Sequence, residues 1–345
     1  MSSTSFLNLT PNAVMAAAEA VGLRPTGHCT PLTCLENRVY DLRLEDNSNV
    51  VLKFYRPGRW SLPEILEEHE FLADLNDSEI PVCSPLQLKS GKTVGIRDTL
   101  HFAVWPRTGG RAPDELRDPE IAILGRLLAR LHNVGATRAL KARPRLDEVT
   151  RLHEPLSFLR DNDFIPPSCE NRYLNAALAV ADRYEELSKE VPMHRIHGDC
   201  HFGNLLRGSS GWFFLDFDDC TEGPAVQDIW MLLPGRDSEG ERQRLLLVKS
   251  YREFRDFEDR WLALVEPLRG MRYVWYAAWI AKRISDPAFP SAFPHFGDEE
   301  YWLRETQDLE AQLEVTYKVS EDKARSRSGT PEEETLSNKD FFWDM

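Results

Sequence analysis

The 345-residue sequence lacks the features that would assign it to a membrane or secreted class. The apolar stretch in its C-terminal third runs from Tyr273 to Ala281, well short of the ~20 residues that cross a bilayer. The first basic residue is Arg24, so the N-terminus has no positively charged segment of a secretory signal. We therefore expect a cytoplasmic protein without a membrane partner.

Cysteine pairs and an excess of basic charge are also missing. The cysteines form no C-x-x-C pair, which argues against a zinc ribbon or a thioredoxin-like site, and we expect reduced thiols. There are 42 Lys and Arg against 56 Asp and Glu, for a formal net charge of −14. Broad binding to a nucleic-acid backbone needs clustered basic residues, so no nucleic-acid partner is expected.

What the chain does contain is enough apolar material for a substantial core. Apolar residues make up 42% of the sequence and aromatic residues 10%, which excludes wholesale disorder. At about 150 residues per domain, the length predicts two domains or one two-lobed unit. We place an N-terminal lobe at 1–107, a C-terminal lobe at 108–317 and a disordered acidic tail at 318–345, where the sequence is rich in Ser, Lys, Arg and Glu.

The N-terminal part alternates between helix and strand patterns. An Ala-rich run after Pro11 predicts a helix, and apolar alternation over 40–44 and 50–55 predicts a hairpin that carries Lys53 on its second strand. A further helix is expected over 63–75 and a lobe boundary at 105–110. Beyond it the chain is mostly helical, beginning with a helix that has Asp118 as its N-cap, Pro119 at its first position and Gly135 past its end, and a β interruption falls near 194–218.

The chemistry lies in that interruption. His197, Asp199 and Asn204 have the spacing H-x-D-x-x-x-x-N, and Asp216 follows on the next apolar run. The sequence between the two runs, Arg-Gly-Ser-Ser-Gly, is typical of a turn. If the hairpin turns about Ser210, Asn204 faces Asp216 on the same side of the sheet.

This set is what phosphoryl transfer requires. A base must accept or orient the proton of the attacking hydroxyl, and oxygen ligands must hold the metal ions that neutralise the phosphates. Mg²⁺ takes hard oxygen ligands and usually one or two from the protein. We therefore predict Asp199 as the catalytic base and Asn204 and Asp216 as metal ligands.

Lys53 supports the same interpretation. An ammonium flanked by apolar strand residues is unfavourable unless it has a partner, and a kinase supplies two, the nucleotide phosphates and a helix carboxylate. Among Glu67, Glu68 and Glu70 of the following helix we expect Glu68 to be that carboxylate. The glycine-rich G-x-G-x-x-G loop is absent, and only the loop 30–38 stands in its place.

Together these motifs resemble the aminoglycoside phosphotransferase/choline kinase superfamily, and within it the stress response kinases of bacteria. The resemblance runs from about residue 8 to 315, through His197–Asn204, Leu215–Asp219, Val51–Pro57, Gly109–Arg111 and Gly223–Leu233. It implies an α+β, bilobal protein-kinase-like fold with a small β-rich N-lobe and a large helical C-lobe.

The resemblance also implies an ATP- and Mg²⁺-dependent serine/threonine protein kinase acting in stress survival. Asp199 falls on the family's proton acceptor, Asn204 on a Mg²⁺ ligand and Asp216 on the second active-site aspartate, also a Mg²⁺ ligand. Asp228 resembles the buried aspartate that braces the catalytic loop. Cys34 falls in the nucleotide-side loop, where the best-known member has Ser, so a hydroxyl contact to ATP is not expected there. The nucleotide-side residues are expected to be Cys34, Lys53, Glu68 and Trp105.

Three alternatives remain open. The acceptor is either a protein Ser or Thr or a small-molecule alcohol, because the loop and metal site serve both. Gly198-Asp199-Cys200-His201 also faintly resembles a metallophosphoesterase motif, although the upstream Asp-x-His pair is missing. The third is a non-catalytic scaffold, against which the presence of all three catalytic polar residues argues. In the leading interpretation the partners are protein substrates and the enzyme is a monomer.

Overall fold

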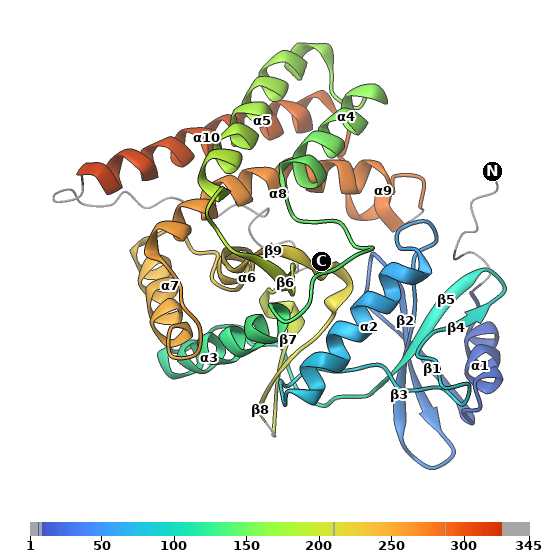
Figure 1. The fold of residues 1–345 in the computed structure, drawn as a ribbon. Coiled ribbons are helices and arrows are strands. Elements are labelled where there is room, and N and C mark those ends of the chain that lie inside the picture. Colours follow the sequence, from blue (N-terminus) through green and yellow to red (C-terminus); the bar gives the residue numbers. More distant parts are fainter. Residues whose placement is uncertain (1–5, 7–8, 210, 287, 326–345) are drawn as a thin grey trace. The chain divides into compact units, whose positions relative to one another are not determined.

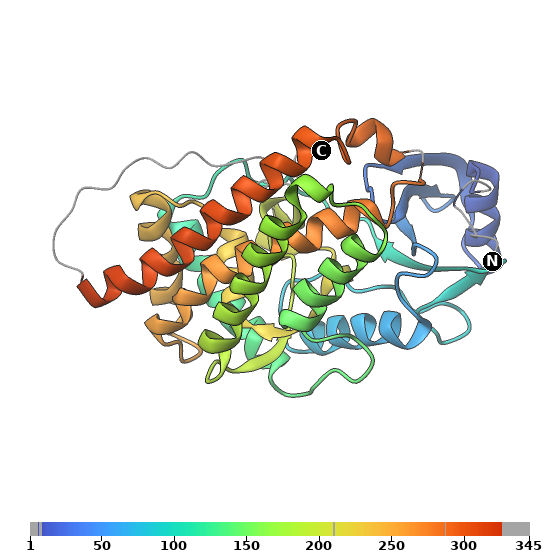
Figure 2. The same ribbon diagram turned by 90° about the horizontal axis from the view of Figure 1, so that it is seen from above.

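The computed structural model describes residues 6, 9–209, 211–286 and 288–325, which divide into two compact units (Figures 1 and 2). Unit 1 comprises Met1–Pro113, Leu140–Arg143 and Asn204–Cys220, and unit 2 the remainder of the chain. The division at 107/108 expected from the sequence lies near the end of the first segment. Two later segments, however, return to unit 1, so Asn204 and Asp216 belong to unit 1 and Asp199 to unit 2.

Unit 1 is built on a five-stranded antiparallel sheet with the order β1-β2-β3-β5-β4. The predicted hairpin is confirmed, with Leu42 opposite Val50. The edge strand β1 was not predicted, because its sequence PTGHCTPL contains Pro, Gly and Thr in place of regular apolar alternation. The strands are β1 (Pro25–Leu32), β2 (Arg38–Leu44), β3 (Asn49–Phe54), β4 (Gly95–Arg97) and β5 (Leu100–Pro106).

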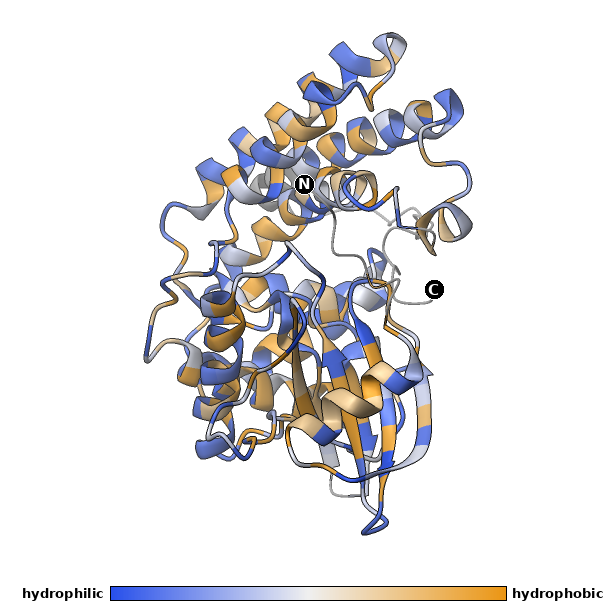
Figure 3. Cartoon of the chain, turned by 90° about the vertical axis from the view of Figure 1, so that its right-hand side faces the viewer, coloured by the Kyte–Doolittle hydropathy of each residue, from blue (hydrophilic) through white to orange (hydrophobic). Residues whose placement is uncertain are grey.

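The two faces of this sheet differ in what they bury. Leu52 and Phe54 on β3 pack in one core with Val14 of helix α1 (Pro11–Ala20). Lys53 points to the opposite face because successive side chains of a strand alternate, and there it meets helix α2 (Leu62–Asp77). The alternation of hydrophobic and hydrophilic residues along the strands is visible in Figure 3. The sheet therefore carries an ordinary apolar core on one face and a charged group on the other.

A second small sheet in unit 1 holds the residues that follow the His197–Asn204 segment. Strands β7 (Leu205–Gly208) and β8 (Gly211–Phe214) pair with Leu205 opposite Phe214 and Gly208 opposite Gly211. The predicted register, with Asn204 opposite Asp216, is therefore wrong by one residue. Gly211, with φ of 113°, closes a tighter turn than expected, and the N–H of Leu215 donates to the carbonyl of Asn204 at 2.8 Å.

Asp216 then leaves the strand. Its φ of 51° is left-handed, and the chain continues into the short helix η4 (Phe217–Asp219). A left-handed backbone is uncommon for residues other than glycine, although Asp and Asn tolerate it better than most. The sharp bend puts Asp216, Asp218 and Asp219 on one compact corner.

Unit 2 is helical apart from β6 (Met193–Ile196) paired with β9 (Thr221–Pro224). Arg195 of β6 is buried and donates to the C-terminal carbonyls of helix α3, Val134 at 3.0 Å and Gly135 at 3.2 Å. The described α-helices of this unit are α3 (Asp118–Gly135), α4 (Glu154–Asp161), α5 (Pro167–Ser188), α6 (Ala225–Leu232), α7 (Ser238–Tyr251), α8 (Val265–Ala281), α9 (Ala288–Ala292) and α10 (Glu299–Arg325), and the shorter helical segments are η2 (Val149–His153), η3 (Phe202–Asn204, shared with unit 1) and η5 (Asp259–Leu264).

The last helix changes the predicted tail boundary. Helix α10 continues to Arg325, past residue 318, where the tail was expected to begin, because apolar and buried positions such as Leu309 and Thr316 anchor its preceding turns. Residues 326–345 lie outside the described residues. Within the described part, no helix is both long and apolar enough to cross a membrane.

The close approach of α3 to β6 yields a stability prediction. A Cβ on Gly135 would overlap the backbone carbonyl of Arg195, which cannot swing away as a side-chain end could. We expect Gly135→Ala to destabilise the protein by about 2 kcal/mol or more, measured by urea denaturation. Gly109→Ala is the matched control, since a Cβ there meets nothing within 4 Å. Equal midpoints for the two variants would contradict this packing.

Candidate active site

Lys53 is the centre of a charged cluster in unit 1. Its Nζ lies 3.4 Å from Glu68 Oε1 on α2, 3.0 Å from Asp216 Oδ1 and 2.8 Å from Asp218 Oδ1. The structure thus brings together Lys53, Glu68 and Asp216, which the sequence analysis had selected. It adds Asp218, which the sequence analysis quoted in its motif but did not assign to the site.

Burial makes this cluster energetically demanding. Lys53 is 7% exposed and Glu68 1% exposed. Burial alone would lower the pKa of the Lys53 ammonium, but its three carboxylate partners outweigh that effect and raise the pKa well above its usual value. Burial conversely raises the pKa of Glu68. The lysine is therefore charged, and its ammonium forms ion pairs with Asp216 and Asp218.

Two arginines complete the cluster, and sequence reasoning missed both. Arg59 lies 2.9 Å from Asp218 Oδ2 and 2.8 Å from Asp219 Oδ1. Arg143 lies 3.3 Å from Glu68 Oε2 and donates to the carbonyls of Asp218 at 2.6 Å and Cys220 at 3.1 Å. The one local sign of these arginines in the sequence was the pair Asp218-Asp219, because two adjacent carboxylates favour cations nearby. No spacing rule indicates which Arg or Lys residues those cations are.

Asp218 and Asp216 play different physical parts. The Asp218 side chain is 5% exposed and that of Asp216 is 44% exposed. Burial alone would raise the pKa of Asp218, but the charges of Lys53, Arg59 and Arg143 outweigh this effect and lower the pKa below its usual value. This carboxylate therefore stays ionised. Asp218 is thus a structural charge, that is, a buried carboxylate that balances the buried cations, whereas the carboxylate of Asp216 is partly exposed and accessible to a ligand.

The donor chemistry at this corner suits a hard divalent cation. The half-exposed Asp216 carboxylate and the Asn204 amide are oxygen donors, and Mg²⁺ commonly takes only one or two protein ligands. Among the described residues there is no group of three or more His, Cys, Asp or Glu arranged as a complete metal cage. Asp216 and Asn204 are therefore the residues here that could hold such a cation.

The other predicted nucleotide-side residues lie around the same lysine. Lys53 Nζ is 4.9 Å from the centre of the Tyr55 ring and 5.6 Å from that of Trp105, both within cation–π range. The Cys34 thiol accepts a hydrogen bond from the Asn37 N–H at 3.4 Å. Burial, followed by the charge of Asp216, raises the pKa of Cys34, so it is a protonated thiol.

The loop that carries Asp199 is shaped within unit 2. Asp228 of α6 is fully buried and accepts from the N–H of His197 at 2.9 Å and of Gly198 at 2.8 Å. Gln227 Nε2 donates to the Gly198 carbonyl at 3.0 Å. Gly198 has a φ of 85°, a conformation that favours glycine. Asp228 thus fixes the backbone directly before Asp199.

Asp199 itself is contacted by Arg272 and His201. Its Oδ1 lies 3.2 Å from Arg272 Nη2 of α8, and its Oδ2 lies 3.4 Å from His201 Nε2. Burial would raise the pKa of Asp199, but His201 and Arg272 lower it below its usual range. The carboxylate is therefore ionised and can accept a proton or hold a hydroxyl in position.

Comparison with known proteins shows the family to which the chain belongs. Residues 29–264 match the model of the Phosphotransferase enzyme family, and the chain belongs to that family. It is accordingly a phosphotransferase of the kinase type. It is 39% identical over 318 residues to Stress response kinase A of Escherichia coli (strain K12), covering 91% of this chain and 95% of that protein. It is also 37% identical over 314 residues to "Serine/threonine protein kinase RdoA" of Salmonella typhimurium, with the same coverage.

Solved structures share the fold at low sequence identity. Amicoumacin kinase hAmiN, solved with AMP-PNP, Ca²⁺ and Ami, has a TM-score of 0.66 and 21% identity and covers 87% of this chain and 93% of its own. Choline kinase LicA from Streptococcus pneumoniae has a TM-score of 0.61 and 14% identity, with 88% and 98% coverage. The expected α+β fold of the aminoglycoside phosphotransferase/choline kinase type is confirmed.

The difference in burial between Asp218 and Asp216 yields a stability prediction. Asp218→Asn leaves buried Lys53 and Arg59 short of a counter-charge, which costs about 3 kcal/mol. Asp216→Asn is the matched variant, since it removes a charge from the same lysine at an exposed position, and should cost under about 1 kcal/mol. Urea denaturation at pH 7 measures both, and equal losses would show that Asp218 is not a structural charge.

The lowered pKa of Asp218 also predicts a pH dependence. Because the folded state holds its pKa below the unfolded value, its contribution is complete above about pH 4, the ordinary aspartate pKa, and is lost as the pH falls further. The stability gap between the wild type and Asp218→Asn should therefore narrow on acidification below about pH 4. A gap that stays constant would mean that Asp218 is not ionised in the folded protein.

Proposed function

We propose that the protein is an ATP- and Mg²⁺-dependent kinase that transfers phosphate to Ser or Thr hydroxyls of other proteins as part of a bacterial stress response. The observation that carries the phosphotransfer chemistry is the buried Lys53 ammonium, aimed at the half-exposed Asp216. The protein acceptor rests on the relatives named stress response kinase and serine/threonine protein kinase, at 37–39% identity. The proposal includes a monomeric, cytoplasmic enzyme.

In this proposal each residue has a defined task. Lys53, positioned by Glu68, binds the nucleotide phosphates, and Trp105 and the Cys34 loop line the nucleotide side. Asp216 and Asn204 hold the metal ion, which when bound neutralises charge on the phosphates. Asp199 accepts or orients the proton of the acceptor hydroxyl.

The properties of Asp199 fit that task. A carboxylate held by Arg272 and His201 with a lowered pKa is a weak base, and a loose phosphoryl-transfer transition state asks mainly for orientation of the hydroxyl. Asp228 contributes indirectly by fixing the loop backbone through His197 and Gly198. Arg272, which the sequence analysis did not assign, is then a positioning residue for Asp199.

A second candidate keeps the chemistry and changes the acceptor to a small-molecule alcohol. Proteins of the same fold are named amicoumacin kinase and choline kinase, which supports this alternative at the level of fold. Membership in the phosphotransferase family favours a kinase, with either acceptor, over the alternative of a metallophosphoesterase.

The acceptor is tested by phosphate transfer from γ-labelled ATP with Mg²⁺. We expect the purified full-length protein to label Ser or Thr residues in proteins of a bacterial lysate, identified by mass spectrometry. Choline, aminopropanol and aminoglycosides serve as small alcohols under the same conditions. Label confined to a small alcohol would overturn the protein-kinase proposal and favour the second candidate.

The role of Asp199 is tested by Asp199→Asn. Removing the proton acceptor should lower the transfer rate by roughly 10²- to 10⁴-fold, while the affinity for nucleotide with Mg²⁺ stays near the wild-type value because the Lys53 cluster is untouched. Asp161→Asn removes an exposed charge from the same unit and is the control. Transfer at the wild-type rate by a folded Asp199→Asn protein would refute the assignment.

The role of Asp216 is tested by Asp216→Asn. This variant removes a formal charge from the proposed metal site and should weaken Mg²⁺-dependent nucleotide binding as well as the rate. Nucleotide titrations over a range of Mg²⁺ concentrations measure it. Unchanged affinity with persistent turnover would place the metal elsewhere.

A further inference from the structure

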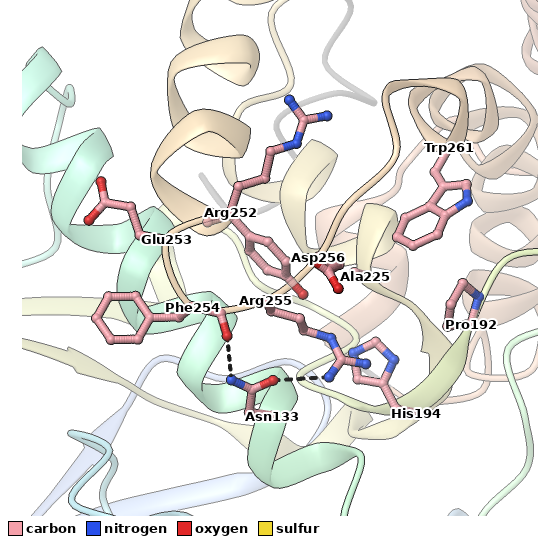
Figure 4. A pocket seen from close by; sticks show the side chains of 11 residues that line it. Asn133, Pro192, His194, Ala225, Arg252, Glu253, Phe254, Arg255, Asp256 and Trp261 are labelled. Carbon is pink, nitrogen blue, oxygen red and sulfur yellow. Dashed lines mark hydrogen bonds between the residues drawn. The ribbon is translucent and has the colours of Figure 1, made fainter.

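Unit 2 contains a pocket of about 550 Å³ that the proposed phosphotransfer does not use (Figure 4). Its wall is formed by the end of α3, by β6 and by the end of α7 with the loop that follows. The lining residues that matter here are Asn133, His194, Tyr251, Arg255 and Asp256. They come from three separate parts of the chain, so the pocket is a product of the tertiary fold.

Arg255 brings an uncompensated positive charge into this pocket. Its side chain is half-buried, and Nη1 donates to Asn133 Oδ1, a neutral acceptor, at 3.0 Å. Among the described residues Arg255 forms no ion pair. Of the neighbouring charges, Arg252 pairs with Asp259 at 2.7 Å and Glu253 with Arg126 at 3.4 Å, and the exposed Asp256 forms no ion pair with Arg255 among the described residues. The guanidinium also interacts with the Tyr251 hydroxyl, and of its five N–H donors some remain for a ligand.

His194 adds a buried ring whose nitrogens make no well-formed hydrogen bond within the described part of the chain, although the carbonyl of Pro192 lies close to one of them. The residue is 5% exposed. Burial, then the neighbouring His132 and Arg255, lower its pKa to about 2. The ring is thus neutral and carries one N–H donor, whose contact with the Pro192 carbonyl is not a well-formed hydrogen bond, and a poorly satisfied buried donor is costly. A bound acceptor would satisfy it.

The same pocket is linked to the loop that carries Asp199. Tyr251, in the pocket wall, has its hydroxyl 2.9 Å from His132 Nδ1, and His132 Nε2 lies 3.0 Å from Asp228 Oδ2. Asp228 in turn holds the N–H groups of His197 and Gly198. His194 also packs edge-on against His132, with ring centres 4.8 Å apart. An unbroken chain of buried hydrogen bonds thus runs from the pocket to the loop.

We propose that this pocket binds a small oxyanion, a carboxylate or a phosphate group, through Arg255 and His194, and that its occupant acts on the His197–Asp199 loop through Tyr251, His132 and Asp228. A guanidinium with free donors matches the planar oxygens of such groups. The exposed carboxylate of Asp256 lines the same pocket, so the ligand is compact and places its charge at Arg255. The proposal goes beyond phosphotransfer, because it concerns a second site.

The binding step is tested by NMR on full-length protein labelled with ¹⁵N-histidine. The chain has nine histidines, so the His194 ring signals are assignable by their loss in His194→Gln. Inorganic phosphate and malonate are the probes, added without nucleotide. We expect saturable shifts of the His194 ring signals, with the affinity at least tenfold weaker in Arg255→Gln and partly restored in Arg255→Lys.

The matched control is Arg260→Gln, which removes an exposed arginine that pairs with Glu190 and Glu258 away from the pocket lining. It should bind both probes with wild-type affinity. His194 signals that do not move, or that move equally in Arg255→Gln and Arg260→Gln, would overturn the site and indicate that only water occupies the pocket. Urea denaturation of each variant confirms that it is folded.

The link to the loop is tested with Tyr251→Phe, which removes the first hydroxyl of the chain and keeps the ring. In uniformly ¹⁵N-labelled protein we expect the Gly198 amide signal to shift on anion binding in the wild type. This shift should be absent in Tyr251→Phe, while the His194 ring signals still report binding. The shift must also vanish in Arg255→Gln, which separates it from anion binding near Asp199. A Gly198 signal that ignores the anion, or that responds equally without the tyrosine hydroxyl, would overturn the link. None of these readouts requires phosphate transfer, so failure here and failure of the proposed function are distinguishable.

Discussion

The structure of unit 1 depends on one demanding interaction, the burial of the Lys53 ammonium. An isolated buried charge is strongly unfavourable, and a buried ion pair stabilises only when its geometry and its remaining hydrogen bonds are satisfied. Three carboxylates from two distant segments surround this lysine, and Arg59 and Arg143 balance their excess negative charge. The bend at Asp216, the short helix after it and the return of Leu140–Arg143 to unit 1 all serve this balance.

In this arrangement, most charged side chains pair with one another inside the protein, and one carboxylate remains accessible to a ligand. Asp218, Glu68, Arg59 and Arg143 are largely buried and hold one another, whereas Asp216 keeps nearly half of its side chain exposed. The proposed function requires such a difference, because a carboxylate that is buried and fully paired with cations of the protein cannot also bind a metal ion. The rigidity of the paired charges in turn orients the exposed one.

Unit 2 also contains a buried charged group, the carboxylate of Asp228. Asp228 is wholly buried, and its oxygens are satisfied by His132 and by two backbone N–H groups of the loop before Asp199. One carboxylate therefore fixes the catalytic loop and simultaneously connects it to α3 and α7. That connection is what gives the Arg255 pocket a physical route to the loop.

The sequence by itself determined the local chemistry. The H-x-D-x-x-x-x-N spacing, the strand lysine and the acidic helix led to the prediction of Lys53, Glu68, Asp199, Asn204 and Asp216 as site residues, because these signals lie within short segments. The fold class followed from the family that these motifs resemble. The sequence did not determine the hairpin register, since Ser-Ser-Gly permits turns that differ by one residue, nor the end of α10, whose polar last turns resemble a tail. Arg59, Arg143, Arg272 and the Arg255 pocket were decided only by the tertiary structure. Their partners lie tens to more than a hundred residues away in the chain, and the charge balance that selects them exists only once distant segments are packed together.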